Sequence, residues 1–192
     1  MKVLVIVDAQ NDFIDGSLGT LEAQAAVPKM VKAIKKFPAN TLVLLTKDTH
    51  DTDYMNTQEG KYLTVEHCNV ATKGWSINNE ISAAVKNGKF YHWSEPDIIN
   101  GRILKSTFGS ERLVKVLNKI NKLDEINLMG FCTDICVISN ALMLKSCFPE
   151  AKINVYADCC AGSTPENHEA AIKVMKACQI NIIEESDNET AN

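Results

Sequence analysis

An aspartate follows directly on the first apolar run of the chain. Residues 3–7 are VLVIV, and Asp8 opens the polar segment DAQND that comes next. Because burial penalises the charged form of a carboxyl group, an acid at such a position gains a raised pKa and can act as a base. Asp8 could equally cap a turn or a helix, and its position alone leaves both interpretations open.

A cysteine lies in a turn between a predicted strand and a predicted helix. Residues 126–130 (INLMG) form a mainly apolar run, and the segment 130–136 (GFCTDIC) ends in this cysteine. The positive end of a helix dipole stabilises a thiolate, and the free N–H groups of such a turn can bind an oxyanion. The alternatives for Cys136 are a buried structural cysteine and a thiol pair with Cys132, although this spacing is not the Cys-x-x-Cys of redox motifs.

Lys105 gains interest from its place in the segment 103–108 (ILKSTF). Taken alone it would be a surface lysine. We expect its loop at the same edge of the sheet as the cysteine, where an ammonium group would lower the pKa of a nearby thiol.

Asp48, His50 and His67 form a candidate metal site. Residues two apart in an extended chain point to the same side, and a distant histidine can complete the set. A carboxylate and two imidazoles suit zinc, iron or manganese. A solvated loop is the alternative interpretation. Asp48 with Asp51 and Asp53 also suggests calcium, but the twelve-residue loop pattern of calcium sites is incomplete.

Apolar patterns along the chain predict strands that alternate with helices. The predicted strands are residues 3–7, 41–46, 90–93, 126–130, 153–157 and 180–183. The predicted helices are residues 22–36, where Pro28 marks a start or a kink, 79–87, 111–121, 134–145 and 165–178. Residues 47–78 and 95–110 are predicted loops. This alternation predicts a three-layer, Rossmann-like α/β fold, a mostly parallel sheet with helices on both faces and ligands at the carboxyl ends of its strands.

Composition and charge narrow the class of protein. The chain has 192 residues, of which 45% are hydrophobic and 23% charged, as in one globular domain. We expect that domain to cover 1–185, with an acidic tail at 186–192. A net charge of -4 without a basic run argues against nucleic-acid or membrane partners. The short N-terminal apolar run lacks the features of a signal peptide, and seven cysteines fit reduced thiols in the cytoplasm.

Together these segments resemble the isochorismatase-like cysteine hydrolase superfamily, and within it the nicotinamidases and pyrazinamidases. The resemblance spans residues 2–183, with the motifs VDAQNDF, DTH, HC, LKSTFG and GFCTDICV in the order of the family. It implies a sheet of six mostly parallel strands and a triad of Asp8, Lys105 and Cys136. Cys136 would be the nucleophile, Asp8 would take its proton, and Lys105 would hold the thiolate and the developing negative charge.

The resemblance also implies the remainder of the site and the reaction. The Phe131–Cys132 peptide bond would be cis and would aim the N–H groups of Cys132 and Cys136 at an oxyanion. A divalent metal on the predicted ligands would position the substrate, and no nucleotide cofactor is expected. The implied reaction is hydrolysis of a small amide through a thioester, with nicotinamide to nicotinate and ammonia as the best candidate. The alternatives are another small substrate (a carbamoyl or ureido compound or an isochorismate-type ether) and a thiol redox or metal-binding protein. By analogy we expect a homo-oligomer.

Two positions depart from the pattern of nicotinamidases. Their stacking tryptophan, three residues before the second metal histidine, is Thr64 here. We therefore expect the aromatic residues Phe13, Tyr62 and Phe131 to line the substrate pocket. Many bacterial relatives also place a further histidine in the first metal loop, where this chain has YMN at residues 54–56.

Overall fold

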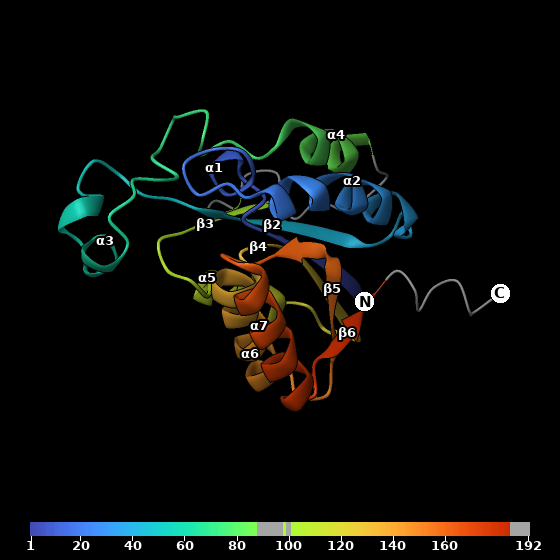
Figure 1. Cartoon of the computed structure of the whole chain (residues 1–192). Helices are drawn as coiled ribbons and strands as arrows, with labels where there is room; N and C mark the ends of the chain where they lie inside the picture. Colours follow the sequence, from blue (N-terminus) through green and yellow to red (C-terminus); the bar gives the residue numbers. More distant parts are fainter. Residues whose placement is uncertain (88–97, 99–100, 185–192) are drawn as a thin grey trace.

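A computed structural model describes residues 1–87, 98 and 101–184 of the chain. One sheet of six strands forms the centre, in the order β3-β2-β1-β4-β5-β6, and every neighbouring pair is parallel. Helices α1, α2 and α4 cover one face of this sheet, and α5, α6 and α7 cover the other (Figure 1). The predicted three-layer α/β fold is confirmed. The strands are β1 Lys2–Val7, β2 Leu42–Asp48, β3 Arg102–Lys105, β4 Glu125–Phe131, β5 Lys152–Ala161 and β6 Asn181–Ile183.

The central strands are apolar because both of their faces are covered. Val3 to Val7 of β1 are fully buried, and every residue of β2 is buried, as expected of strands in a parallel sheet. The chain adds β2 and β3 on one side of β1 and then crosses to add β4 on the other. The strand order therefore reverses between β1 and β4, and the crevice at that point is where parallel sheets bind ligands.

The two longest helices each begin directly after a threonine that caps the helix N-terminus. The helix α2 (Leu21–Lys36) begins after Thr20, whose side chain accepts a hydrogen bond from the Ala23 N–H at 3.0 Å. Pro28 lies inside this helix and does not mark its start. Helix α7 (Pro165–Ala177) begins after Thr164 with a proline in its first turn. The remaining α-helices are α1 Asn11–Ile14, α3 Gln58–Tyr62, α4 Asn79–Asn87, α5 Glu111–Leu117 and α6 Ile138–Cys147.

The sequence did not predict a strand where the structure has β3. The strand β3 (Arg102–Lys105) falls in a segment predicted to be a loop. It is a four-residue edge strand with alternating burial and a cation at each end, so it has no apolar run by which it could be detected. The strand predicted at 90–93 and the tail predicted at 186–192 lie outside the described residues.

Two further features bear on the site. A π-helical turn (Thr133–Val137) precedes α6, where the sequence predicted a regular helix, and the Phe131–Cys132 peptide bond is cis, as expected.

All seven cysteines are free thiols, in agreement with the prediction. Within the described residues, no helix is long and apolar enough to cross a membrane.

Candidate active site

Three predicted side chains from separate parts of the chain meet at the carboxyl edge of the sheet. Asp8 follows β1, Lys105 ends β3, and Cys136 lies in the π-helical turn after β4. The Lys105 Nζ is 2.7 Å from Asp8 Oδ2 and 3.5 Å from Cys136 Sγ. All three residues are buried. A carboxylate, an ammonium and a thiol within one contact shell can activate a sulfur nucleophile.

Asp8 is held in place by its backbone and by Thr46. Its φ of +46° lies in the left-handed region, which a non-glycine residue adopts only where the surroundings fix it. The Thr46 hydroxyl donates to Asp8 Oδ1 at 2.7 Å, and the Asp8 N–H donates to Thr46 Oγ1 at 3.2 Å. Burial raises the pKa of Asp8 above 3.8, the charge of Asp48 adds to the rise, and the Lys105 charge opposes it. A carboxylate with a raised pKa is a better base.

The Cys136 thiol differs from the expectation drawn from the sequence. Lys105 does lower its pKa, as expected, but burial and the negative charge of Asp8 outweigh that effect, and the pKa of Cys136 is raised well above 9.0. Burial would lower the pKa of Lys105, yet the negative charge of Asp8 raises it instead. The resting site therefore holds a protonated thiol beside a charged ammonium group, and the thiol needs a base when it reacts.

Replacing Thr46 with valine should shift the pH dependence of the site. The Thr46 hydrogen bond lowers the pKa of Asp8, so its loss raises that pKa. Since the base must be deprotonated, activity is lost as pH falls through the pKa of Asp8, and in the variant this acid limb moves to higher pH. A pH profile of kcat/KM measures the shift, and an unchanged acid limb would argue against Asp8 as the base. The Asp8 N–H and Oδ1 would also lose their hydrogen-bond partner. The free energy of unfolding, measured by urea denaturation, should therefore fall by about 1–3 kcal/mol.

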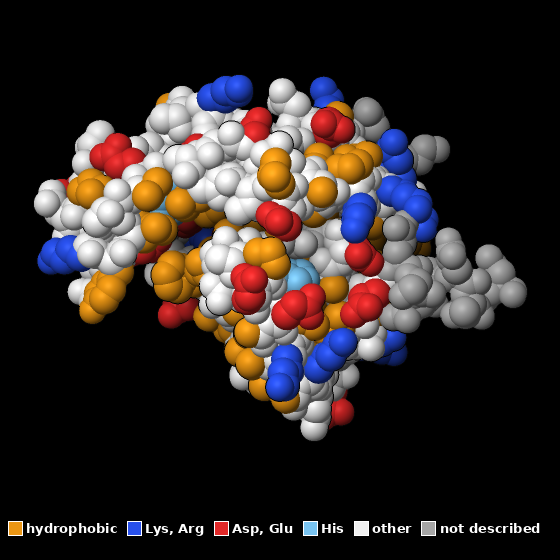
Figure 2. Space-filling view, viewed as in Figure 1, with side chains coloured by type: hydrophobic (Ala, Val, Ile, Leu, Met, Phe, Trp, Pro, Cys, Tyr) orange, Lys and Arg blue, Asp and Glu red, His pale blue; other side chains and the backbone are white. Residues whose placement is uncertain are grey.

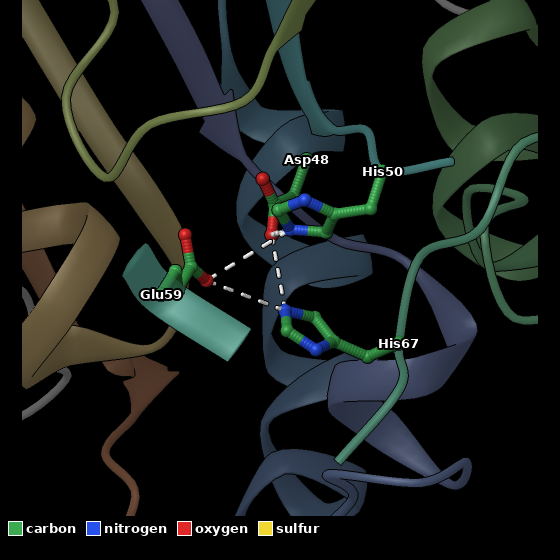
Figure 3. A group of neighbouring side chains, drawn as sticks. All are labelled: Asp48, His50, Glu59 and His67. Carbon is green, nitrogen blue, oxygen red and sulfur yellow. Dashed lines mark hydrogen bonds and ion pairs between the residues drawn. The ribbon is translucent and has the colours of Figure 1, made fainter. Parts of the chain in front are cut away.

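A cluster of four ligand groups lies next to the triad. Asp48, His50, Glu59 and His67 each offer one ligand atom, and these atoms lie within 4.8 Å of one another. Figure 3 shows the four side chains pointing toward a common centre, with Glu59 on α3 facing the other three. Asp48 Oδ2 is 3.1 Å from His50 Nε2 and 3.3 Å from His67 Nε2, and Glu59 Oε1 is 3.8 Å from each imidazole nitrogen.

The chemistry of this donor set fits a divalent metal ion. Two imidazole nitrogens and two carboxylate oxygens are ligands of zinc, iron and manganese. The His67 Nδ1 lies 2.9 Å from the Val65 carbonyl. This contact favours the tautomer that donates from Nδ1 and leaves Nε2 as a lone-pair ligand. Burial would raise the pKa of Asp48, but the hydrogen bond from His50 and the charge of Lys105 lower it below 3.8, so the carboxylate is ionised.

Glu59 is a ligand candidate that the sequence did not predict. It is one of several acids in a polar segment without a period, and it reaches the other ligands only because the short helix α3 folds back over them. The predicted calcium alternative is not favoured, since Asp51 and Asp53 lie exposed and the Asp51 carboxylate accepts a hydrogen bond from the Asp53 N–H at 2.9 Å.

Asp48 joins the metal cluster to the triad. One of its carboxylate oxygens faces the histidines, and the other, Oδ1, is 3.5 Å from the Lys105 Nζ. The metal cluster and the nucleophile therefore belong to one site rather than to two.

A cavity of about 160 Å³ is lined by Cys136 of the triad and by three residues of the metal cluster. Figure 2 shows a recess between the segment that carries α3 and the body of the protein, edged by hydrophobic side chains. The walls hold the thiols of Cys132 and Cys136 together with metal-cluster and apolar side chains. The full lining is Phe13, Leu18, Asp48, Glu59, Leu63, His67, Phe108, Cys132, Ile135, Cys136 and Ser163.

Only one of the three predicted pocket aromatics lines this cavity. Phe13 does so, and its ring packs edge-on against His67 with centroids 5.6 Å apart. Tyr62 is 85% exposed, because α3 turns its side chain to solvent, and Phe131 is fully buried in the core. Neither takes the place assigned to it. Phe108 and Leu63 line the cavity instead. Neither was predicted, since an apolar residue in a loop carries no pattern of its own.

Trp75 packs against Lys47 and Thr49. Its ring lies under the Lys47 ammonium, 3.0 Å from the centroid, and its Nε1 donates to Thr49 Oγ1 at 3.0 Å. Burial lowers the pKa of Lys47 to about 8.

These features define a class of protein: a three-layer α/β fold with a buried aspartate, lysine and cysteine beside a possible metal site. The sequence profile of the Isochorismatase domain matches residues 2–187. The chain belongs to this family, which confirms the resemblance seen in its motifs.

Individual relatives match the chain over nearly its whole length at low sequence identity. The chain is 25% identical to a nicotinamidase of Schizosaccharomyces pombe over 96% of this chain and 93% of that protein. The crystal structure of a nicotinamidase/pyrazinamidase from Bacillus subtilis matches with a TM-score of 0.76 and 21% identity, over 95% of this chain and 99% of the other. The crystal structure of a pyrazinamidase from Pyrococcus horikoshii in complex with zinc matches with a TM-score of 0.74 and 23% identity, over 95% and 98%.

Proposed function

We propose that this protein is a cysteine amidohydrolase that cleaves a small amide, with nicotinamide to nicotinate and ammonia as the best candidate reaction. The observation that carries the proposal is the meeting of Asp8, Lys105 and Cys136, with the Cys136 thiol in the wall of a small cavity that ligand groups of the metal cluster also line. The nicotinamidase and pyrazinamidase relatives support the choice of an amide.

The geometry suggests how the first half of the reaction proceeds. As the Cys136 sulfur attacks the amide carbon, its proton passes to Asp8, and Lys105 stabilises the negative charge that develops. The N–H groups of Cys132 and Cys136, at the turn after the cis bond, would donate to the oxyanion. Asp8 then returns the proton to the nitrogen, the C–N bond breaks, and ammonia leaves a thioester on Cys136.

In the second half, water replaces the thiol as the nucleophile. Asp8 takes a proton from water as the water oxygen attacks the thioester carbon. The C–S bond breaks, the acid product leaves, and the proton returns to the Cys136 sulfur. Lys105 stays charged throughout, in keeping with its raised pKa.

The metal cluster would position the substrate. Asp48, His50, Glu59 and His67 would hold a divalent ion, and the zinc in the Pyrococcus horikoshii pyrazinamidase makes zinc a candidate. When bound, the ion supplies a Lewis acid that orients a ring nitrogen or another lone pair of the substrate. The apolar wall formed by Phe13, Leu63 and Phe108 would pack against a small planar ring.

A thiol redox role is less well supported by the site. Burial raises the pKa of Cys132 to about 12, and a thiol that stays protonated at neutral pH reacts slowly with oxidants. The predicted homo-oligomer and the predicted cytoplasmic location stay predictions.

An ammonia-release assay tests the proposal. The purified chain should release ammonia from nicotinamide and pyrazinamide, should lose most of that activity on dialysis against a chelator, and should regain it with zinc, iron or manganese. A carbamoyl compound turned over in place of nicotinamide would keep the cysteine chemistry and replace the substrate. No ammonia from any of these amides, with metal supplied, would contradict the proposed function.

A further inference from the structure

We infer that two side chains in the turn after β1, Gln10 and Asp12, are positioning residues that hold the backbone segments of the metal ligands. The inference rests on the proposed function, because it concerns the metal site of that function. Neither side chain is a ligand in the cluster. Each instead forms a hydrogen bond to a main-chain atom of a ligand residue or of its neighbour in the chain, beside a further bond to Trp75 for Gln10 and to Ser17 for Asp12.

Gln10 is fully buried, and its side-chain amide forms hydrogen bonds to the backbone of Asp48. Its Oε1 accepts a hydrogen bond from the Asp48 N–H at 2.7 Å, and its Nε2 donates to the Asp48 carbonyl at 2.8 Å and to the Trp75 carbonyl at 3.0 Å. Both backbone groups of Asp48 are therefore tied to one side chain. Since buried backbone groups are costly to leave unpaired, this side chain fixes the position of the Asp48 backbone, from which the ligand carboxylate extends.

Asp12 plays the same part for the second ligand segment. Its Oδ2 accepts a hydrogen bond from the Cys68 N–H at 2.7 Å, on the peptide that joins Cys68 to His67. Gly74 gives this carboxylate its room, since a Cβ there would lie 2.1 Å from the same oxygen. The carboxylate is thus enclosed between the turn after β1 and the loop that carries His67.

Backbone hydrogen bonds join the two segments to each other. The His50 N–H donates to the Cys68 carbonyl at 3.1 Å, and the Val70 N–H donates to the His50 carbonyl at 2.9 Å. The backbones that carry Asp48, His50 and His67 therefore form one unit, and Gln10 and Asp12 attach it to the turn that begins with Asp8. Partners that orient metal ligands typically contribute about 10–100-fold to metal affinity.

The test is metal affinity of the folded full-length chain, measured by Co²⁺ titration and by competition with a chromophoric chelator. Gln10→Met keeps the length of the side chain and removes its three hydrogen bonds, and Asp12→Ala removes the bond to Cys68. We expect each to weaken Co²⁺ binding by about 10–100-fold. Asp12→Asn keeps an oxygen that can accept from the Cys68 N–H and should recover part of the affinity.

Asn11→Ala is the matched control in the same turn. The Asn11 Nδ2 donates to the Lys73 carbonyl at 2.7 Å, which is six residues from His67, so its loss should change Co²⁺ affinity less than twofold. Melting temperatures in chelator report the stability of the metal-free fold. A partly exposed site such as Asp12 allows this comparison even where Gln10→Met folds poorly.

The outcomes separate the inference from the proposed function. Lower melting temperatures with unchanged Co²⁺ affinity in the folded variants would show a merely structural role and overturn the inference alone. A wild-type chain that binds Co²⁺ but releases no ammonia from any amide would contradict the proposed function and leave this inference standing. A wild-type chain that binds no Co²⁺ would overturn the inference, and ammonia release by the same chain would decide the proposed function separately.

Discussion

Replacing Cys136 with alanine should lower kcat/KM for ammonia release by at least about 10⁴-fold. The sulfur lies 3.5 Å from the Lys105 ammonium and lines the cavity. Without it the two-step reaction through a thioester has no first step. The cavity and the metal cluster remain, so the variant should still bind Co²⁺ and should melt near the wild-type temperature.

Cys147→Ala is the control for this experiment. Cys147 is an exposed thiol at the end of α6, and its loss should leave turnover unchanged. Mass spectrometry of the wild-type protein quenched in acid during turnover should show the acyl group on the peptide that contains Cys136. Turnover by Cys136→Ala at the wild-type rate would exclude the thioester mechanism, whichever amide is the substrate.

Two members of the triad, Asp8 and Cys136, were predictable because they follow strands that the sequence reveals. Asp8 comes directly after β1 and Cys136 lies in the turn that follows β4, and these strands flank the point where the strand order reverses. Parallel strands place their carboxyl ends at one edge, so two residues 128 positions apart could be assigned to one crevice. Lys105 was found by its motif, and its strand was not predicted.

The parts that were missed depend on tertiary contacts. Glu59 joins the metal cluster because α3 folds over it, and Leu63 and Phe108 become cavity walls because two loops face each other. Neither a loop path nor the direction of an isolated side chain has a period in the sequence. The misplacement of Tyr62 has the same origin, since a five-residue helix that stands away from the sheet does not reveal which side faces solvent.

The pKa of Cys136 was also misjudged from the sequence, for a related reason. A helix N-terminus and a lysine both favour a thiolate, and both are local features. Complete burial and an ionised carboxylate beside the sulfur come from the assembled fold, and they outweigh the local effects. In the proposed mechanism Asp8 would have two opposed effects: its charge favours the protonated thiol at rest, and its basicity would remove that proton during attack.

Asp8→Asn should separate these two effects of the carboxylate. The change keeps the size of the side chain and removes its charge and its basicity. Turnover should fall by about 10²–10⁴-fold, the usual contribution of a general acid–base group. The remaining activity should lose the acid limb of its pH profile. Circular dichroism and Co²⁺ titration should show that the fold and the metal cluster persist.

The reactivity of Cys136 in the same variant should change in the opposite direction. Because the Asp8 charge raises the pKa of Cys136 and Lys105 lowers it, removing the carboxylate leaves the ammonium group unopposed, and the thiolate fraction at neutral pH increases. Since the thiolate is the form that reacts, alkylation of Cys136 by iodoacetamide should become faster while ammonia release becomes slower. Lys105→Met is the paired control, and in it both rates should fall. If alkylation and turnover fell together in Asp8→Asn, the carboxylate would be a structural support for Cys136 and not the base that serves it.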